Sequence, residues 1–343
     1  MGMIEVVLGT QEAGWRDFLA DQPKAGIFHT PEWANFIYQT FHYKPYYLFA
    51  RDSSRRITGF LPLFQIKSRL TGNRLCSLPF AYQCSILGDP TSQRILLDKA
   101  VELVEELNAA YLEVRDSINN SSFHSSSCYS TYILELSNNP DHVWRKFKSN
   151  VRRNINKSRK YRVMVEETKD MEALKVFYQL NCINKKSLGS PCHPWIFYKN
   201  LFHHLKDHAS LYVASYNNKI IAGGVMLTYG DYFIYGYGAA DPAYLHYRPY
   251  NALLWKSIED ACLKGYRYFD FGRVSVSDSG LIHFKSRWGS VEKKLPYSYY
   301  PQMPRSQIMN RKGFIYQLET ELLQAMPRPI YKRLSNFVFG HIG

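Results

Sequence analysis

The residues best suited to chemistry lie in the segment DFGRVSVSDSGLIHFKSRWG, residues 270–289. We expect this segment to pass from a strand into a helix near Asp278, because Asp and Ser cap helix N-termini. Lys285 follows this junction between aromatic and glycine residues, where an ammonium group is held rigidly and partly stripped of water. Such a cation can act on developing negative charge. The alternative is that Lys285 is a solvated charge and that Phe284 and Trp288 belong to the core.

Four further side chains are candidates for substrate binding near this segment. Arg273 ends the predicted strand, at the rim where α/β sheets bind ligands, and Asp270 either pairs locally with a cation or contacts substrate. Arg248 and Asn251 flank a proline that can start a helix, and a helix N-terminus and an arginine both bind carboxylate or phosphate. The alternative is that Asn251 caps the helix and Arg248 is a surface charge.

Other site chemistries find little support in the sequence. The histidines closest to a metal-binding pattern are His193, His203, His204 and His208. They lack a third ligand at a suitable spacing, so we predict no metal site and solvent-facing or capping roles. No nucleophile elbow, Walker loop or dinucleotide fingerprint occurs, which argues against hydrolases and nucleotide-dependent enzymes. The six cysteines form no C-x-x-C pair, which favours a reducing, cytoplasmic location.

The elements that position these residues emerge when the chain is compared with itself. Residues 47–63, YLFARDSSRRITGFLPL, match residues 211–227, LYVASYNNKIIAGGVML, without a gap. Each copy predicts a hairpin of two strands around a polar turn. Residues 96–113 then match residues 253–270, and each of these copies predicts a helix followed by a short strand.

Two matches in the same order indicate an internal duplication. Each half is predicted to be an α/β unit with a mixed α+β sheet. We place a first domain at residues 1–140 and a second at 141–300. Two C-terminal helices are predicted within 301–343, around 305–326 and 329–339. An amphipathic helix with Val143, Phe147, Val151 and Ile155 on its apolar face is expected to open the second half.

This layout resembles tandem GNAT-type acyltransferase modules. The segment GDYFIYGYGAADPAYLHYRPYNALLWKSIEDACLKGYRYFDFGR, followed by GLIHFKSRWG, resembles the second module of the FemABX peptidoglycan aminoacyltransferases and their wider relatives. The N-terminal FHTPEWANFI is similar to the first helix of that family, so the resemblance covers roughly residues 15–300.

The resemblance implies two GNAT-like domains and an enzyme that transfers an amino acid from aminoacyl-tRNA to an amino group of a cell-wall precursor. It maps the reaction centre onto Lys285, with Phe284 beside it, and includes Tyr237 among the substrate-binding candidates. The chemistry is consistent, because an amine that attacks an ester creates an oxyanion, which a fixed ammonium stabilises. No cofactor is implied.

Two departures bear on the substrates. Ordinary GNAT enzymes cradle the coenzyme A pyrophosphate on a glycine-rich loop, whereas this chain has GAADPAYLHYRPYN there, which disfavours acetyl-CoA. Relatives that act on a UDP-linked peptide carry a Lys soon after the first-helix Trp, whereas no cation follows Trp33 before Lys44. This difference argues against a UDP-linked peptide as the acceptor.

The competing enzyme hypothesis is an N-acyltransferase with a CoA-bound or carrier-bound donor, acting on a surface glycan or lipid precursor.

The charge of the chain is concentrated in one run. Of a formal net charge of +14, residues 145–162 contribute nine cations and no carboxylate, while 45% apolar residues exclude a disordered basic tail. The candidates for binding tRNA phosphates are Arg145, Arg152, Arg153, Lys157, Arg159 and Lys160. A solvated helix face is the alternative, as is contact with the inner membrane surface. A non-catalytic RNA- or membrane-binding module is the third hypothesis, and no transmembrane segment is predicted.

Overall fold

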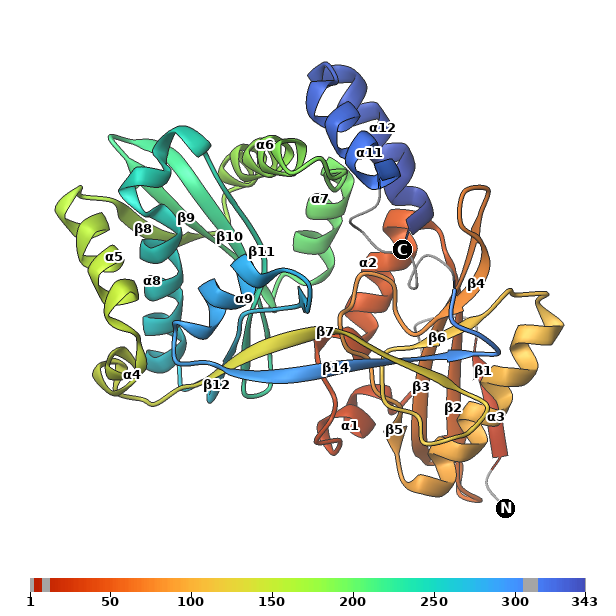
Figure 1. Cartoon of the computed structure of the whole chain (residues 1–343). Helices are drawn as coiled ribbons and strands as arrows, with labels where there is room; N and C mark the ends of the chain where they lie inside the picture. Colours follow the sequence, from red (N-terminus) through yellow and green to blue (C-terminus); the bar gives the residue numbers. More distant parts are fainter. Residues whose placement is uncertain (1–2, 8–12, 305–313, 343) are drawn as a thin grey trace. The chain divides into compact units, whose positions relative to one another are not determined.

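The computed structural model describes residues 3–7, 13–304 and 314–342, which form two compact units. The first unit contains residues 1–128, 295–311 and 337–343, and the second contains 129–294 and 312–336. The predicted ranges divide the chain at residues 140 and 300, whereas the two units interleave in sequence. Each unit is described below by itself (Figure 1).

The first unit is a mixed sheet with helices. Its strands follow the order β1-β2-β3-β4-β6, and the last residues of β14 pair with β6. Its elements are β1 (Met3–Val7), α1 (Trp15–Ala20), η1 (Ile27–His29), α2 (Pro31–Phe41), β2 (Lys44–Arg51), β3 (Ile57–Ser68), β4 (Gly72–Cys76), β5 (Leu87–Gly88), α3 (Pro90–Glu106) and β6 (Leu112–Val114). Strands β7 (His124–Glu135) and β14 (Val291–Tyr300) each have residues in both units.

The second unit contains the sheet order β7-β12-β11-β10-β9-β8. Its strands are β8 (Met164–Thr168), β9 (Ala209–Tyr216), β10 (Lys219–Tyr229), β11 (Tyr232–Ala240), β12 (Tyr268–Asp270) and β13 (Val274–Ser275). Its helices are α4 (Pro140–Lys146), α5 (Ser149–Lys160), α6 (Met171–Ser187), α7 (Trp195–His204), η2 (Pro242–Tyr247), α8 (Pro249–Leu263), α9 (Ser279–Ser286), α11 (Phe314–Ala325) and the first part of α12 (Arg328–Ile342).

The duplicated layout predicted from the sequence is confirmed. The hairpin β2–β3 corresponds to β9–β10, and both pairs are antiparallel. In the first unit β4 runs parallel to β6 after the crossover helix α3, and in the second β11 runs parallel to β12 after α8. Both units therefore present the end of a short strand beside a longer parallel neighbour.

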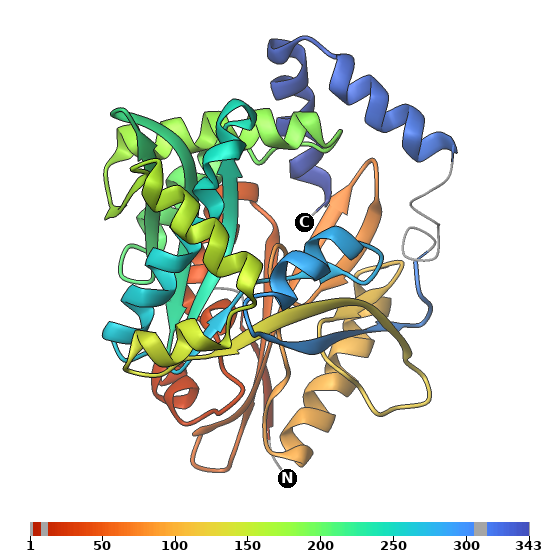
Figure 2. The same ribbon diagram turned by 60° about the vertical axis from the view of Figure 1, so that its left-hand side comes forward.

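Helices cover both faces of the sheet in the second unit, as Figures 1 and 2 let the reader follow. A Cβ added at Gly223 of β10 would lie 2.7 Å from the Phe177 ring of α6, and one at Gly224 would lie 2.9 Å from Leu253 of α8. Successive residues of a strand point to opposite faces, so α6 and α8 pack on opposite sides. The two glycines let both helices approach the strand closely.

The single amphipathic helix expected over 143–155 is wrong in one respect. The chain forms two helices, α4 and α5, because Phe147 and Lys148 between them have extended backbone. The apolar residues still share one core: Phe147 contacts the Trp255 and Trp288 rings at centroid distances of 5.5 and 5.1 Å. The basic residues are thereby left on the outer surface of α5.

Two terminal helices were predicted around 305–326 and 329–339. The structure has α11 over Phe314–Ala325 and α12 over Arg328–Ile342, while residues 305–313 lie outside the described part. Among the helices of the described ranges, none is both long and apolar enough to cross a bilayer.

Candidate active site

The candidate site begins where β12 ends. Strands β11 and β12 pair over three residues, from Tyr232 with Tyr268 to Ile234 with Asp270, and then separate. The turn that follows passes through Gly272, whose φ of 72° is left-handed. A Cβ there would lie 2.8 Å from the Tyr235 carbonyl oxygen, so only glycine lets the turn approach β11 this closely.

Asp270 fixes one side of this turn. Asp270 is 4% exposed, and its carboxylate accepts a hydrogen bond of 2.8 Å from the Gly272 N–H. It also accepts from the Thr131 hydroxyl of β7. Asp270 is therefore a positioning residue for the loop, and its negative charge remains close to Lys285.

Lys285 fixes the other side. Asp278 caps α9 by accepting from the Leu281 N–H at 2.9 Å, as predicted, and the helix directs Lys285 inward. Lys285 is 4% exposed, and its Nζ donates to the carbonyls of Gly272 at 2.6 Å and Arg273 at 3.2 Å. The third proton of this ammonium has no acceptor among the described residues.

Burial lowers the pKa of Lys285, the Asp270 and Asp278 charges oppose this decrease, and the positive charge of Arg273 adds to it. The resulting pKa is about 8. A lysine with this pKa is still mainly protonated at neutral pH, yet it can release its proton far more easily than an exposed lysine. The site thus holds a fixed cation that is also a competent acid.

Phe284 has a supporting position. Its half-buried ring lies 6.2 Å from the Trp288 ring and packs against the core of the unit. This contact holds α9 in place, and so fixes the direction of Lys285. We therefore interpret Phe284 as a positioning residue.

Arg273 lies within electrostatic reach of both Lys285 and Tyr237. The Arg273 guanidinium is exposed and stacks over the Tyr129 ring at 4.5 Å. Burial raises the pKa of Tyr237, and the Arg273 charge opposes this rise. Arg273 thus lies near both Lys285 and Tyr237, and Asp270 lies near Lys285. The role of these residues as one substrate site stays a prediction.

Two residues of this group were not predicted from the sequence. Lys185 of α6 has a lowered pKa, caused by burial and then by the Arg273 charge. His193 is 9% exposed, and its ring lies 5.1 Å from the Tyr237 ring and 4.5 Å from the Phe197 ring. Burial and the nearby Lys185 hold the pKa of His193 well below its usual value.

The solvent-facing role expected for His193 is therefore wrong. Aromatic side chains from α7 and β11 enclose His193. Because β11 is distant in sequence, no local pattern predicts this burial. His208 is half-buried and its Nδ1 lies 3.0 Å from the Thr228 carbonyl oxygen. Within the described ranges, no group of three or more potential metal ligands occurs.

Arg248 and Asn251 belong to the start of α8. Arg248 is exposed in left-handed conformation, with a φ of 61°, and its side chain does not cap the helix. Asn251 is 7% exposed and lies inside the first turn, so the capping alternative for Asn251 is wrong. Their role in substrate binding stays a prediction.

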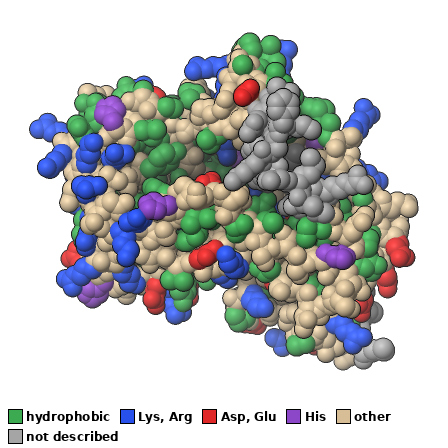
Figure 3. All heavy atoms as spheres, viewed as in Figure 1, with side chains coloured by type: hydrophobic (Ala, Val, Ile, Leu, Met, Phe, Trp, Pro, Cys, Tyr) green, Lys and Arg blue, Asp and Glu red, His purple; other side chains and the backbone are tan. Residues whose placement is uncertain are grey.

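The predicted basic surface extends over α4 and α5. Figure 3 shows Lys and Arg side chains along the edge where Figure 1 places these helices. Arg145, Arg153, Arg159 and Lys160 are exposed, and Arg152 and Lys157 are half-buried. Over the part of the chain that the structure describes, none of these six cations has a carboxylate within ion-pair distance.

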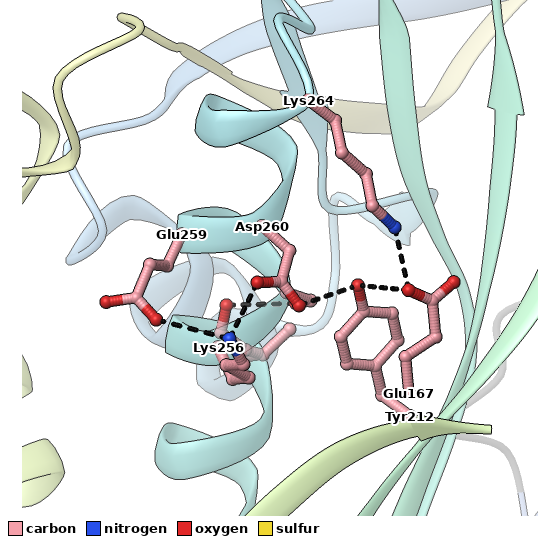
Figure 4. A network of polar contacts seen from close by, with 8 residues as sticks. Glu167, Tyr212, Lys256, Glu259, Asp260 and Lys264 are labelled. Atoms are coloured by element: carbon pink, nitrogen blue, oxygen red, sulfur yellow. Dashed lines mark hydrogen bonds and ion pairs between the residues drawn. The ribbon is translucent and has the colours of Figure 1, made fainter.

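A contrasting polar network in the same unit has all its lysines paired (Figure 4). The Tyr212 hydroxyl lies 3.1 Å from Asp260 and 3.4 Å from Glu167. Lys264 binds Glu167 at 2.7 Å, and Lys256 binds Asp260 at 2.7 Å. This network joins β8, β9 and α8 and is structural, which sets it apart from the unpaired Lys285.

The loop that could hold a coenzyme lies between β11 and α8. It forms the short helix η2, in which Asp241 accepts from the Ala243 N–H, and it contains no glycine between Asp241 and Pro249. Pro249, the first residue of α8, has no N–H to offer a phosphate. Residues 241–249 therefore lack the glycine-rich backbone cradle that is typical of pyrophosphate binding.

Comparison with known proteins agrees with this geometry. Residues 145–286 match the family model for the acetyltransferase (GNAT) domain. A crystal structure of FemX superposes with a TM-score of 0.69 at 15% identity, covering 93% of this chain and 100% of FemX. A comparison with curated protein sequences gave no match.

Two more solved structures share the fold. The C-terminal domain of a lysylphosphatidylglycerol synthetase described as putative, from Agrobacterium fabrum, has a TM-score of 0.60 at 10% identity, with 90% of this chain and 95% of that domain covered. A tandem GNAT protein from the clavulanic acid biosynthesis pathway has a TM-score of 0.53 at 12% identity, covering 86% of this chain and 98% of its own.

These findings define the class: the chain is a transferase, an acyltransferase of the GNAT fold. More particularly, it consists of two tandem GNAT modules, as the FemABX resemblance implied, and the likeness to FemX extends over both modules at the level of fold.

Proposed function

We propose that this protein transfers an amino acid from aminoacyl-tRNA to an amino group of a cell-wall precursor or a small amine. The observation that carries the proposal is the Lys285 ammonium, buried and fixed on two backbone carbonyls with its third proton uncommitted. A preorganised donor of this kind suits the oxyanion that forms when an amine attacks an ester.

The reaction breaks one ester bond and forms one amide bond. The amine nitrogen attacks the aminoacyl carbonyl carbon and gives a tetrahedral intermediate, whose oxyanion Lys285 stabilises. The intermediate then expels the ribose oxygen, which takes up a proton, while the nitrogen loses one. With its pKa lowered to about 8 by burial, Lys285 is also suited to protonate that leaving oxygen.

Three observations support aminoacyl-tRNA as the donor. The FemX likeness covers the whole length of FemX. The name of the lysylphosphatidylglycerol synthetase neighbour describes attachment of lysine to a phospholipid, which is also aminoacyl transfer. Finally, the cations of α5 lack carboxylate partners among the described residues, which suits a polyanionic donor.

Acyl-CoA is the second candidate donor, because residues 145–286 match an acetyltransferase domain family. The replacement of a glycine-rich loop by η2 argues against it. This alternative would use the same lysine and differ in the leaving group, a thiolate instead of a ribose oxygen.

The test is incubation of the full chain with mixed radiolabelled aminoacyl-tRNAs and a set of candidate amines. We expect an amide product that depends on charged tRNA and disappears when the tRNA is deacylated. Product formation from acetyl-CoA, with none from any aminoacyl-tRNA, would overturn the proposal.

A further inference from the structure

A cluster of four tyrosines lies on the surface of the second unit beside the basic helix. Tyr161 follows the last turn of α5, Tyr216 ends β9, and Tyr244 and Tyr247 belong to η2. The Tyr216 and Tyr247 rings stack at 4.4 Å with an interplanar angle of 24°, and Tyr161 meets Tyr247 edge-on at 4.8 Å. We call these residues the tyrosine cluster.

The cluster is accessible to solvent. Tyr161 is 40% exposed, the neighbouring Leu245 is 43% exposed, and the other three tyrosines are half-buried. No residue of η2 is buried, and Tyr247 is the tyrosine of this short helix that packs against the core while staying half-buried.

Two lysine ammonium groups lie over rings of the tyrosine cluster. The Lys157 ammonium lies 5.8 Å from the Tyr161 ring centre, and the Lys219 ammonium lies 4.4 Å from that of Tyr244. Lys219 also pairs with Asp241 at 3.2 Å, so these two charges cancel. The net positive charge comes from Lys157, from Arg153 and Lys160 of α5, and from the exposed Arg248 after Tyr247.

Aromatic rings next to unpaired cations form the surface that binds single-stranded nucleic acid, because bases stack on the rings while phosphates meet the charges. We infer that the tyrosine cluster and α5 bind an unpaired RNA segment, with bases stacked on the tyrosines and phosphates along the helix. The inference rests on the proposed function, for which such a segment is the unpaired 3′ end of the donor tRNA.

The competing partner is an anionic membrane surface, which also attracts tyrosines and cations. The cluster favours RNA for two reasons. The Tyr216 and Tyr247 rings already stack on each other, an arrangement that a base can continue. The exposed apolar side chains of η2 are limited to Leu245, Pro242 and Ala243. The experiment below separates the two partners.

The test measures binding of the full chain to three probes by fluorescence anisotropy and co-sedimentation. The probes are an unpaired RNA of about eight nucleotides, a blunt RNA hairpin with the same number of phosphates, and phosphatidylglycerol vesicles. We expect the unpaired RNA to bind most tightly. Tyr161→Ala should lower the affinity for the unpaired RNA about 5- to 100-fold, which corresponds to the loss of one stacked base. Its affinity for the hairpin should be unchanged.

Matched variants keep the result interpretable. Tyr247→Phe retains the ring and should bind as wild type, while Tyr38→Ala removes a tyrosine of similar exposure, 43%, from α2 of the first unit and should have no effect. Arg153→Gln should lower the affinity for both RNAs alike. It should also reduce the slope of log affinity against log salt concentration by about one, because one phosphate contact is lost.

Unchanged affinity of Tyr161→Ala for unpaired RNA, or equal binding of the hairpin, would overturn the inference. The inference would also be overturned if the tyrosine variants lost binding to vesicles but kept binding to RNA. Because these RNAs carry no amino acid, the outcome is independent of turnover. RNA binding through the tyrosines together with transfer only from acyl-CoA would refute the proposed function and leave this inference standing.

Discussion

Each of the two modules buries one cation beside the end of its short parallel strand, and the two cations are treated differently. In the first unit Arg115, 7% exposed, donates to the Glu113 carboxylate at 2.8 Å and to the carbonyls of Leu78 and Ala81. In the second unit Lys285 donates to two carbonyls, and no carboxylate forms an ion pair with it among the described residues.

The titration of the two groups follows this difference. Burial lowers the pKa of Arg115, but neighbouring Cys76 and Glu113 raise it well above the usual value. For Lys285 the charges of Asp270 and Asp278 oppose the effect of burial only in part, so the pKa falls to about 8. Both modules have the same layout of strands and helix. In the first, the Glu113 carboxylate neutralises the buried Arg115 charge. In the second, the buried Lys285 charge binds carbonyl groups only, within the described part of the chain. We interpret the first as structural and the second as catalytic.

The largest expected effect comes from breaking the buried pair of the first unit. Glu113→Gln leaves the Arg115 charge without its buried counterion, so the free energy of unfolding should fall by about 3–5 kcal/mol, as measured in urea. Transfer rate per folded molecule should not change. Glu292→Gln, which removes an exposed partner of Lys294, is the control and should cost less than about 1 kcal/mol.

A double variant separates charge from packing in the same pair. Glu113→Leu with Arg115→Met removes both charges, so most of the lost stability should return. If the double variant were as unstable as Glu113→Gln, the pair would matter through its shape and not through its charge.

The turn that supplies the Lys285 acceptors is the next point to perturb. Gly272→Ala places a Cβ 2.8 Å from the Tyr235 carbonyl oxygen in a left-handed conformation. Gly265→Ala has the same left-handed strain, with a φ of 83°, but meets nothing within 4 Å. Both variants should lose about 1–3 kcal/mol of stability from strain. Only Gly272→Ala should lose rate as well, about 10- to 100-fold, because Lys285 is misplaced.

The sequence was most informative where the signal is local. The hairpins, the crossover helices and the Asp278 cap follow from side-chain periodicity and turn residues, and the duplication made each copy evidence for the other. Lys285 was selected because aromatic and glycine residues flank it near a predicted helix start, and because the family resemblance maps the reaction centre onto it.

What the sequence did not show depends on contacts between distant segments. No motif near Lys185 indicates that Arg273 lies close to it, and none near His193 indicates its contact with Tyr237. These partners are about 45 to 90 positions further along the chain. The break between α4 and α5 was missed because Phe147 keeps its place on the apolar stripe although its backbone is extended. Likewise, the tyrosine cluster is assembled from three separate elements.

The pH dependence of transfer tests the charge state of Lys285. If the ammonium acts on the oxyanion, the rate should fall about tenfold per pH unit above pH 8. Stability should move in the other direction: between pH 8 and about 10.5 the unfolded chain binds the proton that the native state has lost, so this group makes folding more favourable as pH rises. A rate that rises through pH 8 would instead indicate that neutral Lys285 acts as a base.

The smallest effect is expected at a lysine whose charge is paired. Lys256→Met removes a half-buried lysine from the network of Figure 4, where it binds Asp260 at 2.7 Å. Stability should fall by less than about 1 kcal/mol, and the transfer rate should stay within about twofold of wild type. A large loss of rate would mean that paired cations of the second unit also serve catalysis.

The most direct test of the account is the single-turnover rate of Lys285→Met at saturating aminoacyl-tRNA, measured together with its free energy of unfolding. We expect the rate to fall about 100- to 1000-fold while stability is unchanged or higher, since an unpaired buried charge has been replaced by an apolar side chain. A rate within about threefold of wild type, with the variant folded, would contradict a role for Lys285 at the oxyanion.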